Sequence, residues 1–77
     1  MTGTEAERMW LRTVGMRVRL GRVACRESQD ALAVRAGVSR VTLGSVERGD
    51  HPAGLLTYVR LSGAIDLALA ELLDGAP

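Results

Sequence analysis

The chain has 77 residues, of which 47% are apolar and 25% charged, and its formal net charge is +1. This length allows one small domain, and the composition is typical of a folded protein rather than a disordered or fibrous one. No apolar run is long enough to cross a bilayer and the acidic start is unlike a signal peptide, so we expect a cytoplasmic protein without a membrane segment.

The first predicted helix has two alternative starts. Thr4 and Glu7 have the spacing of a capping box, which would begin a helix that continues to about Arg26. Gly15 and Gly21 interrupt this pattern, so a start near residue 13 is the alternative.

Four further helices follow, with short connections. The second is predicted over residues 29–36 and the third over 40–48, each with a serine directly before it as a cap and a glycine directly after it as a stop. The fourth is predicted over 55–65 and the fifth over 67–73. Asp66 lies between them, where a residue that tolerates the left-handed conformation is needed.

No segment alternates with period two, so the chain is predicted to be all-α with five helices. We divide it into an N-terminal extension (1–13, helical and continuous with the first helix), a domain (14–73) and a tail (74–77). Apolar residues at helical spacing predict the core, which comprises Leu11, Val14, Val18, Cys25, Leu32, Ala33, Ala36, Val38, Leu43, Val46, Leu55, Val59, Leu61, Ile65, Leu69, Leu72 and Leu73.

The segment SQDALAVRAGVSRVTLGSVERG, residues 28–49, carries the clearest motif. It resembles the signature of the lambda-repressor-like, XRE-type helix-turn-helix family, with Ser-Gln, Leu-Ala, Ala-Gly-Val-Ser and Glu-Arg-Gly in register. The resemblance continues through TYVRLSGAIDLALAELL and covers residues 14–73. It implies a compact five-helix DNA-binding domain in a small prokaryotic transcription regulator, a repressor or autoregulator. The third helix would enter the major groove, and a homodimer would bind double-stranded DNA at a palindromic site.

The resemblance also implies roles for individual residues. Gln29, at the start of the second helix, would contact a phosphate, and Ser39 would cap the third helix and reach the DNA backbone. Arg22 and Glu47 would form a buried ion pair between the first and third helices. Arg40, Val41, Gly44 and Ser45 would face the bases, and Arg48 would lie near the DNA backbone or the minor groove. The complete set of DNA-binding positions implied is Gln29, Ser39, Arg40, Val41, Gly44, Ser45 and Arg48.

Six positions depart from the family pattern, of which Pro52 falls one position early and Gly54 takes the usual cap position of the fourth helix. Gly44 lacks the side chain that would point outward into the groove, and Asp50 adds a negative charge close to it. Both departures would weaken DNA binding or change its sequence preference. Gly21 and Glu27 stand where an aliphatic residue is typical.

Met9, Met16, Leu20 and Val23 form a second apolar stripe, opposite the face of the first helix that carries the predicted core. Either the extension folds back over the stripe or the first helix is more enclosed than usual, or the stripe binds a second copy or another protein. The second function hypothesis follows: a protein-interaction module, such as an antitoxin or anti-regulator. The resemblance places the dimer contact elsewhere, at the fifth helix and the Leu72/Leu73 end.

Other residue types point to no chemistry. His51 is the only histidine and Cys25 the only cysteine, so neither belongs to a cluster with metal-ligand or nucleophile spacing. We therefore expect no enzyme activity, no metal and no cofactor. All ten basic residues are arginine, which suits phosphates and guanine edges but is equally the result of a GC-rich genome.

Overall fold

The computed structural model describes residues 3–77, and this part of the chain contains five α-helices and no strand. The predicted all-α, five-helix architecture is confirmed. The first two residues of the predicted 1–13 extension lie outside the described part. The helices are α1 (Glu5–Ala24), α2 (Gln29–Ala36), α3 (Arg40–Arg48), α4 (Leu55–Ala64) and α5 (Leu69–Leu72).

The first helix begins at the earlier of its two predicted starts. The Thr4 hydroxyl accepts from the Glu7 N–H at 3.1 Å, and the Glu7 carboxylate accepts from the Thr4 N–H at 2.6 Å, which completes the capping box. The helix runs unbroken through both glycines. It ends two residues before the predicted end because Arg26 adopts a φ of +57°.

The two glycines of α1 are contact sites rather than interruptions. A Cβ on Gly15 would collide with the Val46 carbonyl oxygen of α3. A Cβ on Gly21 would lie 2.8 Å from the Ile65 Cδ1 atom, just after α4. Each glycine therefore lets a neighbouring segment approach the backbone of α1, which outweighs the small loss in helix propensity.

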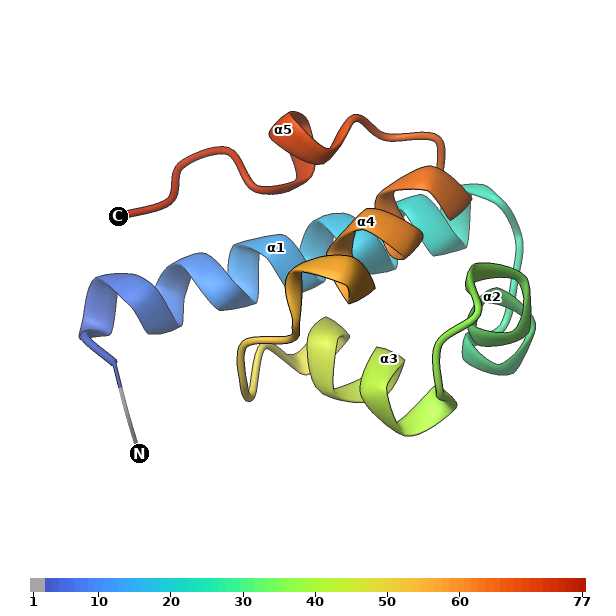
Figure 1. Ribbon diagram of the computed structural model, residues 1–77, viewed down its shortest axis with the longest axis horizontal. Helices are drawn as coiled ribbons and strands as arrows, with labels where there is room; N and C mark the ends of the chain where they lie inside the picture. Colours follow the sequence, from blue (N-terminus) through green and yellow to red (C-terminus); the bar gives the residue numbers. More distant parts are fainter. Residues whose placement is uncertain (1–2) are drawn as a thin grey trace.

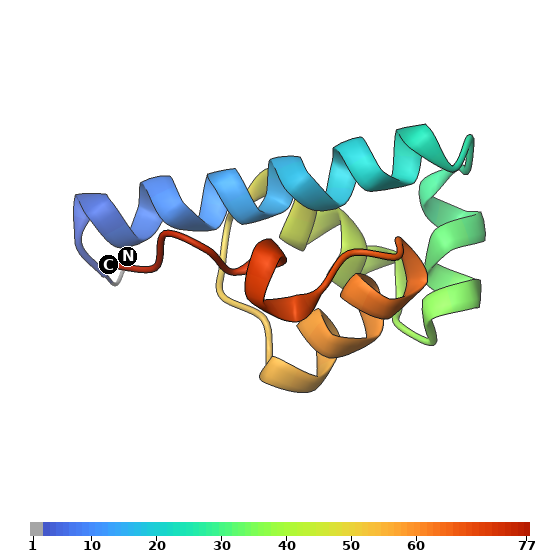
Figure 2. The same ribbon diagram turned by 90° about the horizontal axis from the view of Figure 1, so that it is seen from above.

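In the view of Figure 1, α1 runs between α5 above and α3 below. Seen from above, the remaining helices lie on one side of α1, which forms a long edge of the molecule (Figure 2). Helix α3 packs against α1 and α2, and α4 packs against α2 and α5. The C-terminal segment returns along α1. There the Trp10 Nε1–H donates to the Leu73 carbonyl at 3.1 Å, and Arg17 donates to the carbonyls of Leu72 and Asp74 at 3.0 and 2.7 Å.

The core lies between α1 and the other helices. Its buried apolar residues are Val14, Val18, Leu32, Ala33, Leu43, Val46, Tyr58, Leu61, Ile65 and Leu72. Three residues of the predicted core, Cys25, Leu55 and Val59, are instead exposed. Helix α4 is apolar on most of its faces, so periodicity alone did not identify the inner one.

Tyr58 occupies the inward position on α4 that the sequence analysis gave to Val59. Its ring is buried, and its hydroxyl accepts from the Ala53 N–H at 3.1 Å, so the polar end is satisfied in the loop before α4. The last two helices are shorter than predicted, and between them Asp66 has the expected positive φ, +55°. Among the helices described, none combines the length and hydropathy of a membrane-spanning segment.

The Met9, Met16, Leu20 and Val23 stripe is exposed along its whole length. No described residue folds back over it, so the alternative in which the extension covers the stripe is wrong.

Candidate nucleic-acid interface

Helices α2 and α3 are joined by a three-residue turn whose ends are chemically defined. Gly37 ends α2 with a φ of +73°, which glycine adopts without strain. Ser39 then begins α3: its hydroxyl accepts from the Thr42 N–H at 2.9 Å and donates to the Thr42 Oγ1 at 2.8 Å. Val38, between them, packs against the core. The turn thus fixes the orientation of α3 relative to α2.

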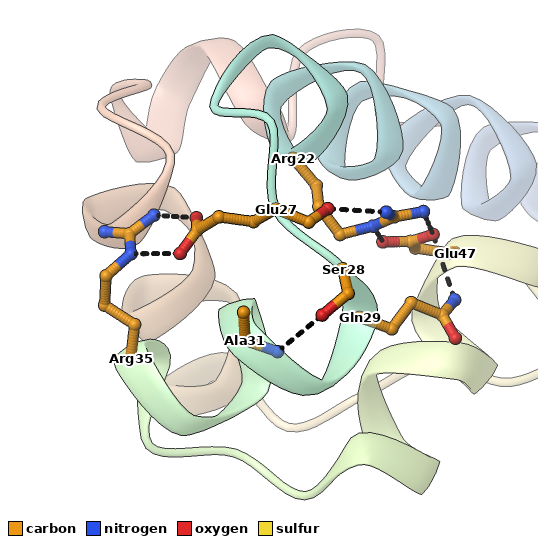
Figure 3. Close-up of polar contacts among 7 residues, drawn as sticks. All are labelled: Arg22, Glu27, Ser28, Gln29, Ala31, Arg35 and Glu47. Atoms are coloured by element: carbon orange, nitrogen blue, oxygen red, sulfur yellow. Dashed lines mark hydrogen bonds and ion pairs between the residues drawn. The ribbon is translucent and has the colours of Figure 1, made fainter.

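One carboxylate connects three helices (Figure 3). Glu47 of α3 accepts from Arg22 of α1 at 2.7 and 3.0 Å and from the side-chain amide of Gln29 of α2 at 3.1 Å. The pair is largely shielded from solvent, with side-chain exposures of 15% for Arg22 and 5% for Glu47. The pKa of Arg22 is raised because its guanidinium donates to this carboxylate. The structure thus holds α3 against α1 and the start of α2 through one charged group.

Glu27, where the family pattern has an aliphatic residue, is paired with Arg35 of α2 (Figure 3). The two parallel hydrogen bonds measure 2.6 and 2.9 Å. This contact lowers the pKa of Glu27, since the bond from Arg35 favours the charged form. Glu27 therefore connects the loop between α1 and α2 to helix α2 by an ion pair, where the family pattern has apolar packing.

Helix α3 has a buried face and an outward face. Leu43 and Val46 are buried, whereas Arg40 and Val41 point outward and Val41 is 76% exposed. Ser45 is partly exposed on the same side, because residues 40, 41 and 45 fall on one arc of the helix. Three of the predicted base-facing side chains thus share one accessible surface.

Gly44 lies at the centre of this outward face, yet it is buried. Outside the helix backbone, the only atom within 4 Å of an added Cβ is the Arg48 Nη1, at 3.2 Å. The Arg48 side chain therefore lies over Gly44, one turn back along α3. The space that the missing side chain of Gly44 leaves on the groove side is therefore occupied by a neighbouring arginine.

The two arginines of the outward face, Arg40 and Arg48, each form an ion pair with an aspartate. Arg48 donates from Nε to Asp50 at 2.6 Å, and the Arg40 Nε lies 3.4 Å from Asp30 on α2. All four side chains are substantially exposed to solvent. The negative charge of Asp50, expected from the sequence to oppose DNA binding, is thus directed at a specific arginine.

Gln29 is the predicted phosphate contact, and its side chain is engaged with Glu47. A primary amide has two N–H donors, and Glu47 takes only one of them. The second donor and the first backbone N–H groups of α2 remain for an anion.

The predicted dimer contact at the end of the chain is wrong for Leu72, which is fully buried inside its own chain. Helix α4 exposes three large apolar side chains, Leu55, Leu56 and Val59. We call these three residues the α4 patch. Helical periodicity does not indicate this patch, because it places Leu55 and Val59 in the core.

Comparisons with known proteins agree with this geometry. The family model described as Helix-turn-helix matches residues 24–72. The restriction-modification controller protein C.AhdI from Aeromonas hydrophila is 37% identical, with a TM-score of 0.75, over 80% of this chain and 94% of that one. The hypothetical transcription factor NHTF from Neisseria is 26% identical, with a TM-score of 0.79, over 95% of this chain and 84% of that one. No curated protein matches.

Proposed function

Because this chain belongs to the XRE-type helix-turn-helix family of DNA-binding transcription regulators, we propose that it inserts α3 into the major groove as a homodimer and acts as a repressor or autoregulator. The outward face of α3 carries this proposal. Its side chains are accessible, while capped ends and the Glu47 contacts hold its backbone in place. The likeness to a restriction-modification controller supports control of such a system as the biological setting.

In this proposal, Arg40 donates two hydrogen bonds to a guanine, and Val41 contacts a thymine methyl group. Arg40 must first leave Asp30, which costs little because the pair is long and exposed. Ser45 lies on the same arc, and Gln29 and Ser39 contact the DNA backbone. Arg48 joins them when it leaves Asp50.

The α4 patch supports the dimer. Leu55, Leu56 and Val59 lie at the start of α4, directly after the loop that follows α3. Pairing two such patches around a two-fold axis buries apolar surface and presents two copies of α3 to successive major grooves.

The test is a gel shift against the chain's own promoter region at two salt concentrations, with a sizing column in parallel. We expect a specific complex that weakens as salt rises, and a dimer on the column. A chain that binds no DNA specifically, yet forms a stable complex with another protein, would contradict the proposal and favour the protein-interaction module.

Arg40→Ala tests the reading of bases directly. We expect a loss of about 1–3 kcal/mol in binding free energy and relaxed specificity at one base pair. Fluorescence anisotropy with the promoter and its single base-pair variants measures both. The control is Arg8→Ala, which removes one positive charge from the first turns of α1. An Arg40→Ala variant with unchanged base preference would refute this assignment.

A further inference from the structure

A line of exposed apolar side chains along α1 takes no part in the proposed DNA contact. Met9, Met16, Leu20 and Val23 are between 56% and 61% exposed. They lie opposite the buried Val14 and Val18, on the side of α1 that faces away from the other four helices (Figure 2). Contiguous apolar surface of this kind on a small domain marks an interaction site.

The spacing of this line is that of a coiled-coil seam. Six exposed residues follow one another at alternating steps of three and four: Ala6, Met9, Thr13, Met16, Leu20 and Val23. This is the a/d repeat by which one helix packs along another. It spans most of the 20 residues of α1, so a partner helix would find a continuous track on a rigid element. We call these six residues the α1 seam.

The free charge at the edges of the α1 seam is positive, because Glu5, one heptad before Arg12, is paired with Arg8 at 3.5 Å. Arg12 and Arg19 occupy equivalent positions one heptad apart on one edge, and neither makes an ion pair with any residue between 3 and 77. On the other edge, Arg17 is turned toward the C-terminal segment, where it binds backbone carbonyls. The unpaired charge next to the seam is therefore cationic.

This charge pattern disfavours a second copy of the chain as the occupant. In a parallel pair of α1 helices, Arg12 would face Arg17 of the second copy. In an antiparallel pair, Arg12 and Arg19 would face the same two residues of the second copy. Like charges at these flanking positions oppose pairing.

We propose that the α1 seam docks an amphipathic helix of a partner protein, with apolar residues at its own a and d positions and acidic residues on its edges. Methionine side chains adapt to different apolar partners, and the two arginines select acidic neighbours. The seam contains none of the proposed DNA contacts, so the partner helix and DNA can bind together.

The probe is a synthetic helix of about three heptads with leucine at a and d and glutamate at e and g. A sister peptide carries lysine at e and g. We expect the full chain to bind the glutamate peptide at least about tenfold more tightly than the lysine peptide, measured by fluorescence anisotropy. Met16→Glu and Leu20→Glu should abolish this binding. Val34→Glu, which adds the same charge at an exposed valine of α2, should retain it.

A double variant tests the charged edge. Arg12→Glu combined with Arg19→Glu should reverse the preference, so that the lysine peptide binds more tightly. Thermal melting verifies that each variant is folded, which we expect because all five altered side chains are exposed.

Four results would overturn the proposal. The first is that neither peptide binds, and the second is that both bind equally well. The third is that the double variant loses DNA affinity without changing its peptide preference, which would make the two arginines phosphate contacts. Self-association that Leu20→Glu abolishes, without peptide binding, would make a second copy the occupant and would also overturn it. The DNA affinity of Met16→Glu and Leu20→Glu should match that of Val34→Glu. Failure of the proposed peptide docking can therefore be distinguished from failure of the proposed regulator function.

Discussion

Arg48 lies over Gly44 and binds Asp50, so the centre of the proposed reading surface carries an arginine already paired with an acid. From the sequence alone, both features predict weaker DNA binding or a changed sequence preference. Together they form one arrangement: the missing side chain makes room for the guanidinium, and the aspartate two residues later holds it there. A DNA phosphate must compete with Asp50 for Arg48.

Asp50→Asn tests this competition. We expect several-fold tighter DNA binding at low salt and a steeper salt dependence, because Arg48 becomes free for a phosphate. Asp66→Asn is the matched control, since it removes the same charge at the corner between α4 and α5, and asparagine accepts the positive φ there. If both variants bind DNA equally, general repulsion rather than the Arg48 contact explains the effect.

Glu27 gives a pH-dependent contribution to stability. Its pKa is lower in the folded chain than in the unfolded chain because Arg35 donates to it. The unfolded chain therefore binds more protons between the two pKa values, so the stabilisation is present above the ordinary pKa and is lost as pH falls through the lowered one. Glu27→Gln should be less stable than the parent at neutral pH, and the difference should vanish in acid. Urea melts across this range measure it; a difference independent of pH would contradict the prediction.

At the scale of the helices, α1 and α3 meet at backbone distance because Gly15 has no side chain. Gly15→Ala should destabilise the fold: the clash with α3 costs about 1–3 kcal/mol, more than alanine's gain in helix propensity of about 1 kcal/mol. Gly63→Ala in α4 is the control. Apart from its chain neighbours and its own helix backbone, no atom lies within 4 Å of its added methyl group, so it should raise the melting temperature. Thermal melts that move in the same direction for both variants would contradict this explanation.

Local signals predicted some elements completely. The bounds of α2 and α3 are those expected, because a serine and a glycine define the two ends of each. The errors have non-local causes. In the sequence, Gly15 and Gly21 resemble interruptions of the first helix. In the structure, Val46 and Ile65 pack against their backbone. The inner face of α4 was misassigned because nearly every residue there is apolar, and the position of Arg48 depends on an acid outside its helix.

On the scale of the whole molecule, two apolar surfaces remain exposed, and we assign them different partners. Leu56→Glu, in the α4 patch, should produce a monomer on a sizing column and weaken binding to a palindromic site, because each half-site is then bound separately. Met16→Glu, in the α1 seam, adds the same charge at a side chain that is similarly exposed and should leave the dimer intact. A dimer that survives Leu56→Glu but not Met16→Glu would reverse the two assignments.

The way α3 is held has an evolutionary consequence. Its buried side chains, its two caps and the Arg22–Glu47 ion pair all lie outside positions 40, 41 and 45, and the Arg40–Asp30 pair at position 40 is long and exposed. The framework therefore places almost no demand on what occupies those three positions. Relatives that share this scaffold can diverge in the operator they recognise without losing the fold. The same division makes α3 a suitable place to graft a new DNA specificity.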